Sequence, residues 1–247
     1  CPSKATEDMI VTDFTGIYAR QPFTAEATVV PCADLTGTDC YCDDEAAAEL
    51  ARRLAPHPLR AVHFLDSGNY HYLTKLWTDR IDRPFDLVLF DRHTDMQPPA
   101  FGDLLSCGSW VRRMLDRNPL LRRVCVAGAP ADREAAAEYP GRVLFCGGTP
   151  DDPAWRHFAG AEDPTPLYVS VDKDVLAPDW AATNWDQGTM TLPELCDMLR
   201  SLLLRRTVLG ADVCGEYAPE EAIADEGCVA RNDRANAALY ELLRTAL

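Results

Sequence analysis

The sequence predicts an α/β fold in which helices cover both faces of a mainly parallel sheet. Short apolar runs alternate with helical patterns along the chain, and this alternation is typical of strand, helix, strand units joined by right-handed crossovers. One run, residues 87–90, is continuously apolar, as expected for a strand buried on both faces. The chain has 247 residues, of which 47% are hydrophobic, enough for one large core. We therefore expect a single domain over residues 1–247.

The elements follow from local patterns of apolar, capping and turn residues. The expected strands lie at residues 9–18, 27–32, 60–65, 85–91, 124–128, 143–145, 167–171 and 207–213. The expected helices lie at residues 43–54, 72–77, 109–117, 131–139 and 191–204, with a closing helix from Asn232 or Asp233 to about residue 247. Asp43 or Asp44 caps the first of these helices, and Thr191 with Glu194 has the spacing of a capping box.

Charge and hydropathy narrow the range of partners. The formal net charge is −15 and no basic run occurs, which argues against nucleic acid or an anionic membrane as a partner. No apolar run reaches the roughly 20 residues of a membrane helix, and the amino terminus lacks a basic and then hydrophobic segment. We expect a soluble, cytoplasmic protein. The acidity suits a cationic substrate or a metal, although most of these carboxylates have the ordinary role of keeping a protein soluble.

The ten cysteines do not form the pattern of a disulfide scaffold. They are spread over a long chain, and Cys125, Cys146 and Cys214 lie within or beside apolar runs. Cys40 and Cys42 form a C-x-C with no second pair at zinc spacing. The sequence therefore predicts mostly buried, reduced thiols.

A polar cluster follows the apolar run at residues 87–90. Asp91, His93 and Asp95 are separated by single residues and come at the carboxyl end of a predicted parallel strand, where open α/β sheets place their sites. Carboxylates and an imidazole held by a stiff element are suitable metal ligands. The alternative is a solvated loop after a strand.

Other candidates follow three further predicted strands. Asp172 and Asp174 form a second acidic cluster after residues 167–171, although Asp174 could instead cap a turn before Pro178. His71 comes at a helix start, where a lone histidine is more often a packed or capping residue than a ligand. Glu216 follows the last strand, as a substrate ligand or as a loop carboxylate exposed to water.

Three segments resemble the metal-binding motifs of the arginase and agmatinase family, the ureohydrolases. That family carries Gly-Gly-Asp-His, then Asp-Ala-His-x-Asp, then Ser-x-Asp-x-Asp, each after a parallel strand. The corresponding segments here are Gly68-Asn69-Tyr70-His71, Asp91-Arg92-His93-Thr94-Asp95 and Ser170-Val171-Asp172-Lys173-Asp174. All six ligand positions are filled in family order, and the resemblance covers about residues 65–219.

The resemblance implies a three-layer α/β/α fold that holds two divalent metal ions, most often Mn²⁺. The family pattern assigns His71, Asp91, Asp95 and Asp172 to one ion, and Asp91, His93, Asp172 and Asp174 to the other. Asp91 and Asp172 would therefore bridge the two ions. It also implies hydrolysis of a linear C–N bond in a small cationic guanidino or amidino compound by a hydroxide that bridges the ions.

Two positions decide how far the family's chemistry carries over. Glu216, in Glu216-Tyr-Ala-Pro219, matches a Glu-x-x-Pro pattern whose carboxylate holds the substrate guanidinium, with one extra residue after Asp212. Cys107 stands where the family usually has a proton-transfer histidine. We expect a modified catalytic role for this thiol, with simple packing as the alternative.

The sequence is also compatible with two other functions. Deacetylases of similar architecture use one zinc ion, which would leave the ligands of a second ion without a role. A metal-binding protein that has lost turnover would account for Cys107 and for the altered loops around Gln97 and Trp185. Those loops differ from the ones with which arginases bind an amino-acid head group, so arginine itself is not the expected substrate. By analogy with the family, a homo-oligomer is also an expectation.

Overall fold

The computed structural model describes residues 8–160, 163–217 and 226–247. Within these residues, eight strands form one sheet in which every neighbouring pair is parallel. They are β1 (Met9–Asp13), β2 (Thr28–Pro31), β4 (Val62–Phe64), β5 (Phe85–Phe90), β7 (Leu121–Ala127), β8 (Val143–Cys146), β9 (Leu167–Asp172) and β10 (Val208–Cys214). Their order across the sheet is β2, β1, β4, β10, β9, β5, β7, β8. The predicted parallel sheet is confirmed.

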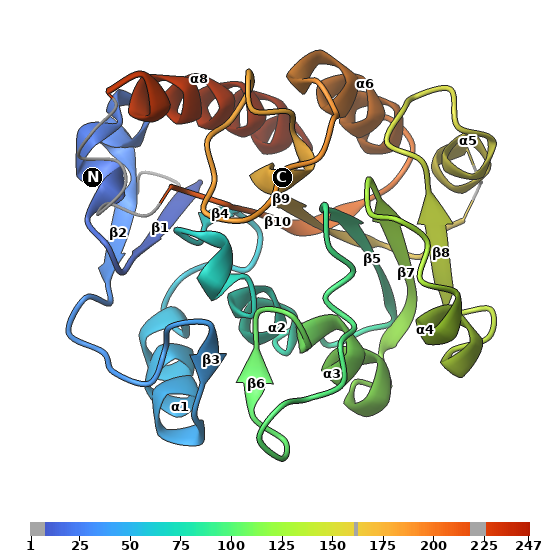
Figure 1. Cartoon of the computed structure of the whole chain (residues 1–247), viewed down its shortest axis with the longest axis horizontal. Coiled ribbons are helices and arrows are strands. Elements are labelled where there is room, and N and C mark those ends of the chain that lie inside the picture. The colour runs from blue at the N-terminus through green and yellow to red at the C-terminus, as the bar shows by residue number, and fades with distance from the viewer. Residues whose placement is uncertain (1–7, 161–162, 218–225) are drawn as a thin grey trace, which may run out of the picture.

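Helices cover both faces of this sheet, and the fold is therefore a three-layer α/β/α arrangement, as predicted. They are α1 (Asp44–Leu54), α2 (Leu73–Thr78), α3 (Trp110–Arg117), α4 (Arg133–Glu138), α5 (Pro153–Gly160), α6 (Leu192–Leu203) and α8 (Glu226–Leu243). Figure 1 shows α6 and α8 along one side of the sheet, and α1, α2 and α3 along the other. None of the helices in the described ranges is long and apolar enough to cross a membrane.

The core is divided in two by the sheet because successive strand residues point to opposite faces. In β5, Val88 and Phe90 pack in the cluster that includes the apolar side chains of α5, α6 and α8. Leu87 and Leu89 pack in the other cluster, with those of α1, α2 and α3. All six residues of β5 are buried, which explains the continuous apolar run in the sequence.

Two of the three helix starts predicted from capping residues are confirmed. Asp43 accepts a hydrogen bond from the Ala46 N–H at the start of α1, and Thr191 with Glu194 forms the predicted capping box of α6. The closing helix is the exception, because it begins at Glu226 and not at Asn232. The Asn232 amide is used in a tertiary contact instead, donating to the carbonyl of Ala182. Helix α5 was not predicted.

A small antiparallel pair lies apart from the main sheet and was also not predicted. Strand β3 (Tyr41–Cys42) pairs with β6 (Leu105–Ser106). The adjoining backbone continues this pairing, since the Cys107 N–H donates to the carbonyl of Cys40. The pair holds both cysteines at the wall of a cavity that opens above the carboxyl ends of the central strands.

Candidate metal centre

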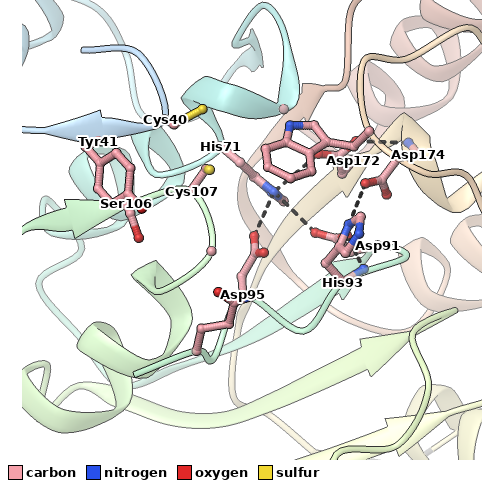
Figure 2. A pocket seen from close by; sticks show the side chains of 14 residues that line it. Cys40, Tyr41, His71, Asp91, His93, Asp95, Ser106, Cys107, Asp172 and Asp174 are labelled. Atoms are coloured by element: carbon pink, nitrogen blue, oxygen red, sulfur yellow. Dashed lines mark hydrogen bonds and ion pairs between the residues drawn. The ribbon is translucent and has the colours of Figure 1, made fainter. Parts of the chain in front are cut away.

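The predicted ligands meet because their strands lie close together in the middle of the sheet, where β9 pairs with β5 and β10 separates β9 from β4. Strand β4 leads through a short 3₁₀ turn (Gly68–Tyr70) to His71, and β5 ends directly before Asp91. Strand β9 ends at Asp172 and continues into a 3₁₀ turn that carries Asp174. Parallel strands present their carboxyl ends at one edge, so all six predicted ligands line one cavity of about 240 Å³ (Figure 2).

One group of donor atoms surrounds His71. Its Nδ1 lies 3.2 Å from Asp91 Oδ2, 3.1 Å from Asp95 Oδ2 and 3.5 Å from Asp172 Oδ2. All four of these side chains are buried. Figure 2 shows the imidazole of His71 pointing toward the carboxylates. Three oxygens around one nitrogen at these distances are a group that could hold a cation with mixed nitrogen and oxygen ligands.

The orientation of the His71 ring is set from its other side. Its Nε2 lies 2.9 Å from the Ser170 hydroxyl, which donates its own hydrogen to Asp212 Oδ1 at 2.5 Å. Because that hydroxyl hydrogen is already used, Ser170 accepts a hydrogen bond from Nε2–H. In the neutral ring this leaves the lone pair on Nδ1, facing the carboxylates, which is the tautomer that a metal ligand requires. Ser170 and Asp212 are thus positioning residues that the sequence analysis did not identify.

A second group surrounds His93. Its Nδ1 lies 2.8 Å from Asp174 Oδ2 and 3.6 Å from Asp91 Oδ1, while its Nε2 lies 2.9 Å from Asp186 Oδ1. Asp91 therefore offers one oxygen to each group, as a bridging ligand would. In both predicted bridges one oxygen also accepts a backbone N–H. Asp91 Oδ1 accepts that of His93, and Asp172 Oδ1 accepts that of Asp174, while Asp172 Oδ2 faces His71.

The charge of this cluster calls for cations. Burial, with repulsion from Asp91, raises the pKa of Asp174 to about 7. Burial and the nearby Asp95 also raise the pKa of Asp91. Asp91 Oδ2 is buried and accepts no hydrogen bond, although it faces His71. An acceptor of this kind is costly to bury unless an ion occupies the space beside it, so these residues fit two divalent metal ions.

Cys107 lies where its predicted role needs it, in the wall of the same cavity. Figure 2 shows its sulfur beside that of Cys40. The hydrogen bond between the two thiols and partial burial raise the pKa of Cys107 above its ordinary value, whereas the same hydrogen bond lowers the pKa of Cys40. Cys107 therefore carries its proton at neutral pH, and in this state it can donate but not accept one.

Glu216, the expected substrate ligand, is not among the described residues that line the cavity. It is fully buried and forms an ion pair with Lys173, which is itself buried. It also accepts hydrogen bonds from Gln21 at 2.7 Å, Asn232 at 3.0 Å and Asn236 at 2.6 Å. With both oxygens occupied by these four donors, the carboxylate holds α8 and the amino-terminal segment against the sheet.

Comparison with known proteins shows which family has this sequence pattern. A sequence model described as the arginase family matches residues 69–238, about two thirds of the chain. The chain belongs to the arginase family. A protein of Thermotoga maritima, described only as uncharacterised, is 34% identical over 216 residues, which are 85% of this chain and 80% of that protein.

Solved structures of arginase-family enzymes share the fold at low sequence identity. Proclavaminate amidino hydrolase from Streptomyces clavuligerus is 18% identical, with a TM-score of 0.67 over 99% of this chain and 94% of that one. Arginase from Medicago truncatula is 15% identical, with a TM-score of 0.68 over 96% and 86% of the two chains. Formimidoylglutamase from Bacillus subtilis is also 15% identical, with a TM-score of 0.67 over 97% and 86%.

Proposed function

We propose that this member of the arginase family is a hydrolase that uses two divalent metal ions to cleave a linear C–N bond in a guanidino or amidino compound. The observation that supports this most strongly is the pair of histidine and carboxylate groups that share Asp91 on the wall of one cavity. The similar structures include an amidino hydrolase, an arginase and a formimidoylglutamase, and these names refer to different substrates. The similarity therefore supports the class of reaction but does not identify the substrate.

The six predicted ligands would hold the two ions. His71, with Asp95 and Asp172, would serve one ion and His93, with Asp174, the other, while Asp91 serves both. When bound, the ions would lower the pKa of a shared water and so supply a hydroxide nucleophile near neutral pH. Among the usual divalent ions, Mn²⁺ suits oxygen-rich ligand sets of this kind.

The rest of the cavity favours a cationic substrate. None of the described residues that line it is lysine or arginine, whereas four are aspartates. Trp185 forms part of the wall, where its Nε1–H donates to Asn69 Oδ1 at 2.9 Å and its ring approaches that of His93 at 5.9 Å. A guanidinium or amidinium group is attracted by carboxylates and by the face of an indole ring.

Cys107 would supply the proton that the reaction requires on the departing nitrogen. Its Sγ–H lies in the cavity wall, and the thiol carries its proton at neutral pH, so a proton is available at the cavity where the amine would leave. The proton transfer proposed here therefore runs from Sγ to the leaving amine. A histidine at this position would act over a different pH range.

A substrate panel tests the proposal. Protein reconstituted with Mn²⁺ should release urea or ammonia from at least one guanidino, amidino or formimidoyl compound, and Asp91→Asn should abolish this release. A panel of acetylated amines serves as the comparison, because turnover of those compounds alone would favour a deacetylase-like activity. Absence of turnover on both panels, with both ions bound, would support a metal-binding protein without hydrolase activity.

A further inference from the structure

Cys214 is a buried thiol that the six predicted ligands do not include. It is the last residue of β10, the strand that lies between β4 and β9. In the register of the sheet it is the direct partner of Asp172, and its side chain is fully buried. The sheet therefore places this thiol beside the strands that lead to His71 and Asp172.

The Cys214 thiol lies close to two of the predicted ligands. Its Sγ lies 3.1 Å from Asp172 Oδ2, the same oxygen that lies 3.5 Å from His71 Nδ1. One donor atom from each of these three residues lies within 4.8 Å of the other two. Ligand atoms about 2.0 to 2.3 Å from one zinc ion are separated by about 3 to 4 Å, so the group has the dimensions of a metal site.

Two further observations concern the residues around this group. The unpartnered Asp91 Oδ2 is directed at His71 Nδ1 from 3.2 Å, so a cation at this imidazole would satisfy it as well. Gly215 has a φ of +88°, and a Cβ there would lie 2.4 Å from Asp172 Oδ1. Only glycine therefore lets Asp172 approach the chain immediately after Cys214.

Another buried pair of thiols shows the contrast. Cys125 Sγ and Cys146 Sγ lie 3.3 Å apart, and both residues belong to the apolar cluster on one face of the sheet. Cys214 belongs to the apolar cluster on the other face of the sheet, but its Sγ donates to a carboxylate and lies near an imidazole. It is this polar contact that sets Cys214 apart from the other two thiols.

We propose that Cys214 is an additional ligand of the ion held by His71 and Asp172, and that this position prefers a softer divalent ion such as Zn²⁺ over Mn²⁺. The inference rests on the proposed metal centre and changes the identity of one ion. The thiol hydrogen, now donated to Asp172, passes to solvent as the metal–sulfur bond forms. Thiolate sulfur favours zinc and cobalt, whereas the group around His93 keeps only oxygen and nitrogen donors and stays suited to Mn²⁺.

Cobalt(II) provides a direct probe because thiolate ligation has its own spectrum. The protein is stripped of metal and titrated with Co²⁺. When cobalt occupies the site of His71 and Asp172, the protein should show thiolate-to-cobalt charge-transfer absorption in the near ultraviolet. Cys214→Ser should remove this absorption but keep the visible bands of bound cobalt. Cys107→Ser and Cys196→Ser are matched controls, since one thiol lies in the cavity wall and the other on α6, and both variants should keep the absorption.

Metal competition and X-ray absorption extend the test. At the site of His71 and Asp172, Cys214→Ser should lower the affinity for zinc relative to manganese by about tenfold or more. In the wild type, zinc X-ray absorption should show a sulfur neighbour at about 2.3 Å, a measurement that needs no variant. Cobalt bound without charge-transfer absorption would overturn the role of Cys214 and leave the metal centre intact. No cobalt bound at all would overturn both.

Discussion

Removing the metal ions should reverse how stability depends on pH, because the two site histidines bind protons in the metal-free protein. The hydrogen bond with Asp174 and the nearby Asp91 carboxylate raise the pKa of His93 to about 12. Burial alone would lower the pKa of His71, but Cys214, Asp91 and Asp95 together raise it well above its ordinary value. In the metal-free protein both imidazoles are therefore cations that partly neutralise the carboxylates.

The sign and size of the effect follow from proton linkage. A histidine whose folded pKa exceeds its unfolded value of about 6.5 stabilises the protein fully below pH 6.5, and loses this contribution as pH rises toward the folded value. For His93 the loss between pH 6.5 and 8 is at most about 1.6 kcal/mol, because the unfolded histidine is already half deprotonated at pH 6.5 and solvent screens the half-buried ring. His71 acts in the same direction. In the metal-loaded protein the rings are neutral ligands, and protons only compete with the ions.

Urea unfolding of metal-free and Mn²⁺-loaded protein at pH 6.5 and 8 measures this effect. The difference in unfolding free energy between the two forms should widen at the higher pH, by up to about 1.6 kcal/mol from His93 and by a further amount from His71. His93→Asn should reduce the widening, and His157→Asn, at an exposed position on α5, should leave it unchanged. Burial lowers the pKa of His63 to about 3, so it contributes below pH 6.5 and does not disturb this range. A constant or narrowing difference would refute the assignment of both histidines as ligands.

Three other substitutions have distinct expected results. Asp91→Ala should lose both ions and Asp174→Ala only one, as measured by metal analysis after gel filtration, and equal losses would contradict the bridging role of Asp91. Cys107→Ser should lower kcat by roughly 10² to 10⁴ with metal content unchanged, and wild-type turnover in this variant would show that the thiol only packs. Glu216→Gln should destabilise the fold by about 3 to 5 kcal/mol, because it leaves the Lys173 charge buried, and should leave KM unchanged if Glu216 does not touch substrate. Lys173→Met combined with Glu216→Gln should recover part of that stability.

The sequence was sufficient to predict the parallel sheet and the residues that meet at the carboxyl ends of its strands. The sequence of β5 contains a continuous apolar run followed by Asp91, which predicts a buried strand. The position of that strand in a parallel sheet determines where the Asp91 carboxylate lies. The same logic brought His71 and Asp174 to the same edge. These predictions depend on the end of a strand and on a rule that holds for all parallel sheets.

The sequence was not sufficient for contacts that depend on which strands are neighbours. Cys214 lies beside Asp172 because β10 pairs with β9, and no local sequence pattern reveals that pairing. Glu216 and Lys173 are 43 positions apart, and each reads as a solvated charge until the fold buries both. For this reason the sequence did not predict that buried donors would occupy both oxygens of Glu216. Pro219, the end of the motif that suggested a contact with substrate, lies outside the described residues.

The number of metal ions bound per chain tests the central claim most directly. Full-length protein, stripped of metal, reconstituted with Mn²⁺ and Zn²⁺ and passed over a desalting column, should retain two divalent ions per chain by elemental analysis. Two ions are expected because two groups of ligands share Asp91. Retention of no more than one ion per chain would contradict the binuclear centre and favour the deacetylase-like alternative.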